Sequence, residues 1–226
     1  MPRVLARLAA DAALVGALLF AAAGTTAWGR AWALLAVMLA VRAAGAYAVH
    51  RVHPALLRER AGLPVHAAQS RADRLLVLAV LATGFLGLPA VAGLDAFRWH
   101  LLPAPSPAVA ALGLLLFALG WAVKNLALRA NAFAVPSARV QGERAHAVAD
   151  GGVYGLVRHP FYAADALVFA GQGLWLGSYA AALGAAVPLA LVVVRLRLEE
   201  RLLVRELPGY AEYAGRVRYR LVPGVW

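Results

Sequence analysis

The chain has 226 residues, of which 63% are apolar, and its 22 Lys and Arg outnumber 11 Asp and Glu, giving a net charge of +11. Repeated apolar runs of about 20 residues exclude an ordinary soluble fold and indicate an integral membrane protein. The absence of cysteine excludes disulfides, thiolate metal sites and cysteine nucleophiles. Because the basic residues lie between the apolar runs, we expect them to set membrane topology and expect no nucleic acid partner.

Six apolar segments predict an all-α, polytopic membrane helix bundle with about five to six spans. The first four segments can each cross a hydrocarbon core of about 30 Å at about 1.5 Å per residue. The last two are shorter, and because only Gly177 and Ser178 separate them we expect a C-terminal helical hairpin, whose full crossing the sequence leaves open. An interfacial C-terminal helix should follow. The segments cover residues 4–24, 31–49, 74–93, 107–128, 163–176 and 179–194.

The arginines predict the orientation of the bundle. Almost all of them flank the apolar segments on one side, and only Arg30 and Arg98 fall in loops on the other side. By the positive-inside rule, both termini should face the cytoplasm. The arginine- and alanine-rich composition, with its single lysine, is typical of a GC-rich bacterium, so we expect the inner (cytoplasmic) membrane. Residues 1–130 would form the N-terminal transmembrane helices, and residues 131–226 a core that carries the polar motifs.

The stretch GLVRHPFYAADAL, at residues 155–167, places polar groups at the start of an apolar run. Pro160 suits the first position of a helix, and the free N–H groups of that helix start, beside His159, could bind an anionic group. Alternatively, Arg158 is only an interfacial charge and His159 only a helix cap. Asp165 argues for a site, because a carboxylate at membrane depth costs about 3 kcal/mol unless it faces a partner or a wet cavity.

The segment VVVRLRLEERLL, at residues 192–203, places Arg195 and Glu199 four residues apart on one helical face. A surface ion pair at this spacing would stabilise the helix by a few tenths of a kcal/mol. Spacing alone does not separate this interpretation from a functional pair.

Three motifs together resemble one family. They are GVYGLVRHPFY at residues 152–162, the pair Glu199-Glu200 after the two-helix hairpin, and YAEYAGRVRYRLVP at residues 210–223. This combination resembles the isoprenylcysteine carboxyl methyltransferase family and its phospholipid-methylating relatives, strongly from Asn131 to the C-terminus. The resemblance implies a catalytic methyltransferase core at 131–226 that uses S-adenosylmethionine, with no metal, to methylate a lipophilic, carboxylate-bearing acceptor at the cytoplasmic membrane face.

The resemblance also implies roles for individual residues. Glu199 would accept hydrogen bonds from the ammonium of the donor, while His159 would help to hold its carboxylate. Arg195 matches a substrate position and would orient the acceptor, and Asp165 is a further candidate for substrate contact. Arg195, His159 and Glu199 are thus the expected catalytic residues. The expected cofactor contacts are Gln141, His146, Ala147, Val148, Ala149, Tyr154, His159, Pro160, Phe161, Tyr162 and Glu199.

Two alternatives stay open at this point. Ala164 replaces the glycine common after the RHPxYx motif, and the following Asp165 also resembles the membrane sterol reductases, which use NADPH. A non-catalytic membrane protein is the other alternative. The methyltransferase hypothesis makes one geometric prediction: Glu199 must reach the same pocket as His159 and Tyr154.

Overall fold

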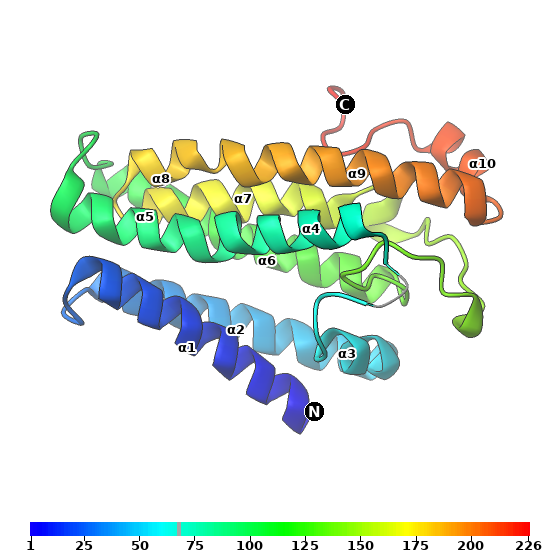
Figure 1. Ribbon diagram of the computed structural model, residues 1–226, viewed down its shortest axis with the longest axis horizontal. Helices are drawn as coiled ribbons and strands as arrows, with labels where there is room; N and C mark the ends of the chain where they lie inside the picture. The colour runs from blue at the N-terminus through cyan, green and yellow to red at the C-terminus, as the bar shows by residue number, and fades with distance from the viewer. Residues whose placement is uncertain (67–68) are drawn as a thin grey trace.

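The structure is a computed structural model that describes residues 1–66 and 69–226. Every element within these residues is a helix, and the long helices run side by side as one bundle (Figure 1). The predicted all-α fold is therefore confirmed. Five segments are long and apolar enough to cross a membrane, which agrees with the five to six spans expected. They are Pro2–Ala23, Gly29–Val52, Arg71–Trp99, Pro107–Ala130 and Tyr179–Glu206.

The first two spans form a pair of neighbouring helices, α1 (Pro2–Ala23) and α2 (Gly29–Val52). Gly24 ends α1 in the left-handed region with φ 74°, where a residue with a Cβ would be strained. The short helix α3 (Pro54–Arg60) follows α2 directly. Its first residue is a proline, which cannot continue the hydrogen bonding of α2 but suits a new helix start.

The third span is an interrupted helix. The chain passes from α4 (Arg71–Val80) through a π-helical stretch at Leu81–Gly87 into α5 (Leu88–Leu94), and a second π-helical stretch follows at Asp95–Trp99. Pro89, at the start of α5, has no N–H to donate, and its ring would clash with a carbonyl of the preceding α-helical turn. The wider π turn accommodates this proline.

The predicted C-terminal hairpin is present. After α6 (Pro107–Ala130), α7 (Pro160–Trp175) turns into α8 (Tyr179–Gly184), which continues as α9 (Ala186–Glu206). The segment Tyr179–Glu206, which contains α8 and α9, has 28 residues, so the second arm is long enough to cross a membrane. The apolar segment at residues 179–194 lies within this arm, and the helix continues to Glu206, so Arg195 and Glu199 share a helix as their spacing predicted.

Glycines allow α6 and α7 to approach closely. A Cβ on Gly113 would lie 2.7 Å from the backbone nitrogen of Trp175, and a Cβ on Gly171 would lie 2.6 Å from the carbonyl oxygen of Gly113. A Cβ on Gly120 would lie 3.0 Å from the carbonyl oxygen of Ala164. Small residues at such crossings are typical of helix packing in membranes, where close contact replaces the hydrophobic driving force.

We expect Gly120→Ala to destabilise the bundle by on the order of 1 kcal/mol, because the added methyl group overpacks the contact between α6 and α7. Gly29→Ala is the matched control, since a Cβ at that position meets nothing within 4 Å. Thermal unfolding in detergent should show a lower midpoint for Gly120→Ala and no loss for Gly29→Ala. Equal stability of the two variants would contradict this packing account.

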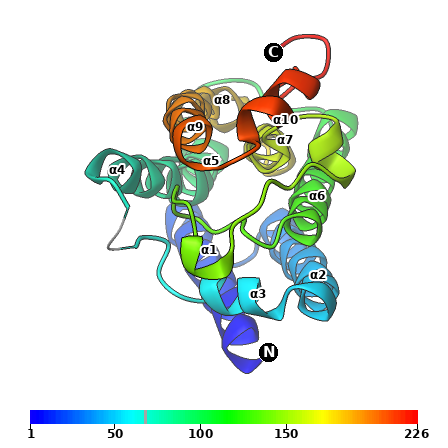
Figure 2. The ribbon, with the colours of Figure 1, turned by 90° about the vertical axis from the view of Figure 1, so that its right-hand side faces the viewer.

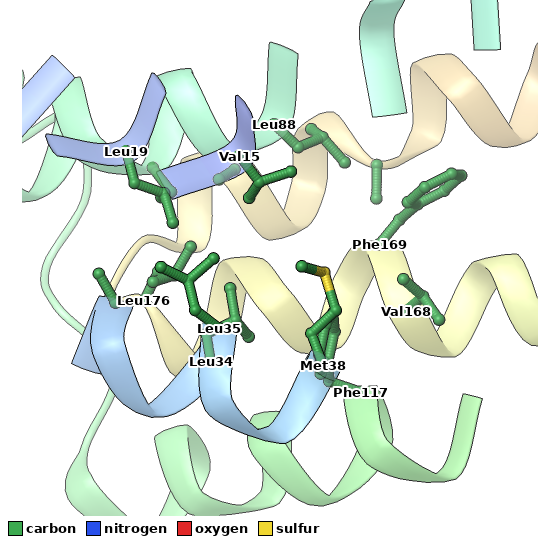
Figure 3. Packing of buried hydrophobic residues seen from close by; sticks show 14 of the residues in the cluster. Val15, Leu19, Leu34, Leu35, Met38, Leu88, Phe117, Val168, Phe169 and Leu176 are labelled. Atoms are coloured by element: carbon green, nitrogen blue, oxygen red, sulfur yellow. The ribbon is translucent and has the colours of Figure 1, made fainter. Parts of the chain in front are cut away.

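The buried apolar core lies between the N-terminal helices and the C-terminal hairpin. Figure 3 shows side chains from α1, α2, α5, α6 and α7 meeting in one cluster. The cluster links both parts of the chain, because its residues are contributed by the segments before and after residue 130. The labelled members are Val15, Leu19, Leu34, Leu35, Met38, Leu88, Phe117, Val168, Phe169 and Leu176.

One end of the bundle gathers the polar motifs. Both termini, α3 and the loop between α6 and α7 lie at this end (Figure 1). Viewed from that end, the loop crosses between α1–α3 on one side and α9 and α10 (Tyr210–Arg216) on the other (Figure 2). The sequence segments expected to share one side of a membrane are therefore close together in space.

Candidate active site

A cavity of about 490 Å³ lies at the end of the bundle that carries the polar motifs. Residues from α1–α4, α6, α7, α9, α10 and the loop between α6 and α7 line it. The geometric prediction for Glu199, His159 and Tyr154 is met, because all three line this cavity. Most of the other expected site residues also line it: His146, Ala147, Val148, Ala149, Phe161, Tyr162, Asp165 and Arg195.

Two expected cofactor contacts, Gln141 and Pro160, do not line the cavity. Gln141 is fully buried, where its Nε2 donates to the carbonyl of Phe133 (2.7 Å) and its Oε1 accepts from Arg144. Its backbone N–H donates to Nδ1 of His146 (3.2 Å). Gln141 thus holds the loop that presents His146, while Pro160 starts α7.

Arg195 and Glu199 do not form the surface ion pair that spacing alone allows. Arg195 is buried; its Nε donates to Oδ1 of Asp73 (2.7 Å), and its two Nη groups donate to the hydroxyl of Tyr162 and to the carbonyl of Pro136. The Tyr162 hydroxyl in turn donates to Glu199. The chain Asp73–Arg195–Tyr162–Glu199 therefore fixes the position of the Glu199 carboxylate from across the bundle.

Asp73 is a member of this site that the sequence did not single out as one. It lies in the first turn of α4, where its N–H donates to the hydroxyl of Ser70, the N-cap residue (3.2 Å). Both Asp73 oxygens are used, since Oδ2 accepts from the side chain of Gln69 and from the backbone of Ala138 (2.9 Å). The sequence signal that could have indicated this role is an acidic residue directly before an apolar span.

Glu200, unlike Glu199, is an internal structural group. Its Oε1 accepts from Nε of Arg158 (2.7 Å) and lies 3.3 Å from Nε2 of His159, and its Oε2 accepts from Nε of Arg220 (2.6 Å). Because two guanidinium groups and an imidazole surround it, this carboxylate joins the core motif to the C-terminal segment. A buried charge with this number of partners is costly to disturb.

The C-terminal segment packs against the residues that precede α7. The N–H of Arg158 donates to the carbonyl of Tyr219 and that of His159 to the carbonyl of Arg220, both at 2.9 Å. The N–H of Tyr162 donates to the carbonyl of His159. The C-terminal segment thus accepts from the N–H groups of Arg158 and His159, which ties it to the core motif. Binding of an anionic group at the start of α7 itself stays a prediction.

Three tyrosines form the wall next to Glu199. Tyr154 is buried, and burial raises its pKa to about 12, so its hydroxyl stays protonated at neutral pH. Its carbonyl accepts from the Tyr213 hydroxyl (2.8 Å). Tyr210 is 5% exposed, and its hydroxyl has no hydrogen-bond partner among the described residues. Such a group is available to a ligand, since a buried hydroxyl without a partner is unfavourable. Tyr210 and Tyr213 both lie in the motif at residues 210–223, but the sequence alone predicts no role for either side chain.

Asp165 has the partner that its position in the membrane requires. Its Oδ1 lies 2.6 Å from Nζ of Lys124, which is only 1% exposed. Lys124 also lies over the ring of Phe161, with Nζ 3.7 Å from the centroid. Lys124 does not reach the membrane surface, because its side chain is buried within the bundle. A direct contact of Asp165 with substrate stays a prediction.

The fold and the cavity define the class of the molecule: a polytopic helical membrane protein with a ligand-sized cavity at one end, lined by both apolar and charged side chains. Residues 108–208 match the sequence model of the phospholipid methyltransferase family. The predicted resemblance is confirmed over that segment, and the match supports a membrane methyltransferase with a lipid-type substrate. No curated protein matches the chain.

Proposed function

We propose that the protein is an S-adenosylmethionine-dependent methyltransferase, similar to the isoprenylcysteine carboxyl methyltransferases. It would act on a lipophilic, carboxylate-bearing acceptor at the cytoplasmic face of a bacterial inner membrane. The observation that carries this proposal is Glu199, a carboxylate in the cavity wall, inside the segment matched by the family. Among the described residues no cation lies within 4 Å of it, so it can accept hydrogen bonds from a cationic ligand.

The described residues fit the chemistry of the donor. Glu199 would accept from its ammonium, and the buried hydroxyl of Tyr210 would supply a further hydrogen bond. The rings of Tyr154 and Tyr162 offer apolar and aromatic surface for the adenine and for the cationic sulfur. His146 would stay neutral, because burial and the nearby Arg144 and Arg139 lower its pKa.

The chain's own residues would act by positioning. When bound, S-adenosylmethionine supplies a methyl group: the acceptor oxygen bonds to the methyl carbon while the carbon–sulfur electron pair passes to sulfur, leaving a methyl ester and a neutral thioether. A carboxylate acceptor is already ionised, so no residue has to remove a proton. Tyr162, held by Arg195, would fix Glu199, and the surrounding helices would keep bulk water away.

The test is turnover by the purified full-length chain in lipid nanodiscs. Incubation with S-adenosylmethionine labelled in its methyl group and with a bacterial lipid extract should yield S-adenosylhomocysteine and a labelled, base-labile ester in the lipid fraction. A labelled amine would support methyl transfer but contradict the carboxylate acceptor. Oxidation of NADPH without binding of S-adenosylmethionine would instead favour the reductase alternative and overturn the proposal.

A further inference from the structure

The cavity has a second, mainly apolar part next to the N-terminal helices. Its wall is formed by α1, α2 and α3. These helices lie on the other side of the loop between α6 and α7 from α9 and α10, which contribute Glu199, Tyr210 and Tyr213 to the lining (Figure 2). A wall of this composition suits a hydrocarbon chain. The apolar side chains that line it include Val4, Leu8, Val15, Met38, Ala46, Val49 and Leu57.

The charges in the cavity wall are largely paired. Lys124 pairs with Asp165, Arg158 with Glu200, Arg195 with Asp73 and Arg139 with Glu143. Arg7 and Arg42 share the carboxylate of Asp11, at 2.9 Å and 2.6 Å. The wall formed by α1–α3 therefore carries an excess of positive charge, because two of its arginines share one carboxylate and Arg60 adds a third cation.

Arg60 is the cation in this wall that lacks a carboxylate. Within the described part of the chain, no acidic group lies within 4 Å of its guanidinium. Its Nη1 donates to the carbonyl of Ala134 (2.6 Å), and its Cζ lies 5.0 Å from the centroid of the Phe161 ring. Arg60 is partly buried, and this burial lowers its pKa to about 10. A partly desolvated cation without a counter-ion is unfavourable, and an anionic ligand would reduce that cost.

Arg195, the residue expected to hold the acceptor, is less suited to that role. Its guanidinium already donates to Asp73, Tyr162 and the carbonyl of Pro136. Asp73 also balances its charge, so a second anion would have to compete with an existing ion pair. Arg60 has no such competitor and lies against Phe161, next in sequence to Tyr162.

We propose that Arg60 binds the anionic group of the lipid acceptor, whose hydrocarbon chain lies along the wall formed by α1 and α2. This inference rests on the proposed function and assigns to α3, in the N-terminal part of the chain, the recognition of the acceptor. Glu199 would bind the cationic donor on the opposite side of the same cavity. Opposite charges on the two sides would keep donor and acceptor in separate places, with their reacting groups between them.

The test uses the full-length chain in phosphatidylcholine nanodiscs and two radiolabelled probes, palmitate and hexadecyl phosphate, with methyl palmitate as the uncharged reference. We expect Arg60→Gln to weaken binding of the preferred anionic probe about tenfold or more, as removal of a charged hydrogen bond predicts. Arg60→Lys should retain part of the affinity. Arg58→Gln is the matched control, because Arg58 lies in the same helix, is exposed and does not line the cavity.

Binding of S-adenosylhomocysteine is measured on the same samples and should be unchanged in all variants, which also shows that they are folded. Tighter binding of palmitate would identify a carboxylate acceptor, and tighter binding of hexadecyl phosphate would identify a phosphate acceptor. Either result supports the inference. It is overturned if Arg60→Gln binds both anions as the unaltered chain does, or if that variant loses S-adenosylhomocysteine instead. Failure of the unaltered chain to bind S-adenosylhomocysteine would count against the proposed function itself.

Discussion

Glu199→Gln is expected to weaken the binding of S-adenosylmethionine by about ten- to a hundredfold. A hydrogen bond between charged partners contributes about 1.5–3 kcal/mol, and the amide keeps the shape of the side chain while removing its charge. Because the neighbouring Tyr162 and Arg195 stay in place, the loss should fall on affinity for the donor rather than on the fold. Isothermal titration calorimetry of the detergent-solubilised chain measures this affinity.

Glu212→Gln is the matched control for this experiment. Glu212 is an exposed carboxylate of α10 that does not line the cavity, so the same change there should leave donor affinity unaltered. A Glu199→Gln variant with unaltered affinity for S-adenosylmethionine would remove Glu199 from the donor site. The proposed function would then lose the observation on which it depends.

Much of the fold could be predicted from the sequence, because apolar length and turn residues determine where helices can cross a membrane. The hairpin around Gly177 and Ser178 is an example, since two apolar runs separated by two residues have few alternatives. The burial of Arg195 in α9 could not be predicted in this way. Arg195 interrupts the apolar run, and hydropathy alone does not reveal that a distant carboxylate makes its burial possible.

The sequence predicts those residues of the candidate site that lie close together in the chain, as in the motif around His159 and Tyr162. It does not predict the ion pairs between residues that are far apart in the chain. Asp73 and Arg195 are separated by 122 residues, and the two members of the buried pair Lys124–Asp165 by 41. The residues around each charged side chain do not indicate its partner, because these contacts depend on how α4 packs against α9 and α6 against α7. The cost of burying a charge predicts only that a partner exists.

The adjacent acidic residue, Glu200, should affect stability rather than affinity for the donor. Glu200→Gln leaves the guanidinium groups of Arg158 and Arg220 without their shared carboxylate. Breaking a buried ion pair by removing one partner costs about 3–5 kcal/mol. Since this carboxylate joins the core motif to the C-terminal segment, we expect that segment to detach from the start of α7 before the bundle unfolds.

Hydrogen exchange tests this expectation directly. The backbone N–H groups of Arg158 and His159 donate to the C-terminal segment and should exchange faster in Glu200→Gln by more than about a hundredfold, following the free energy lost. Glu206→Gln removes an exposed ion pair with Arg205 in the same helix and should leave these amides as slow as before. If the amides of Arg158 and His159 exchange at the same rate in both variants, Glu200 does not hold the C-terminal segment. If exchange rises throughout the bundle, Glu200 stabilises the whole fold rather than the contact between the C-terminal segment and the start of α7.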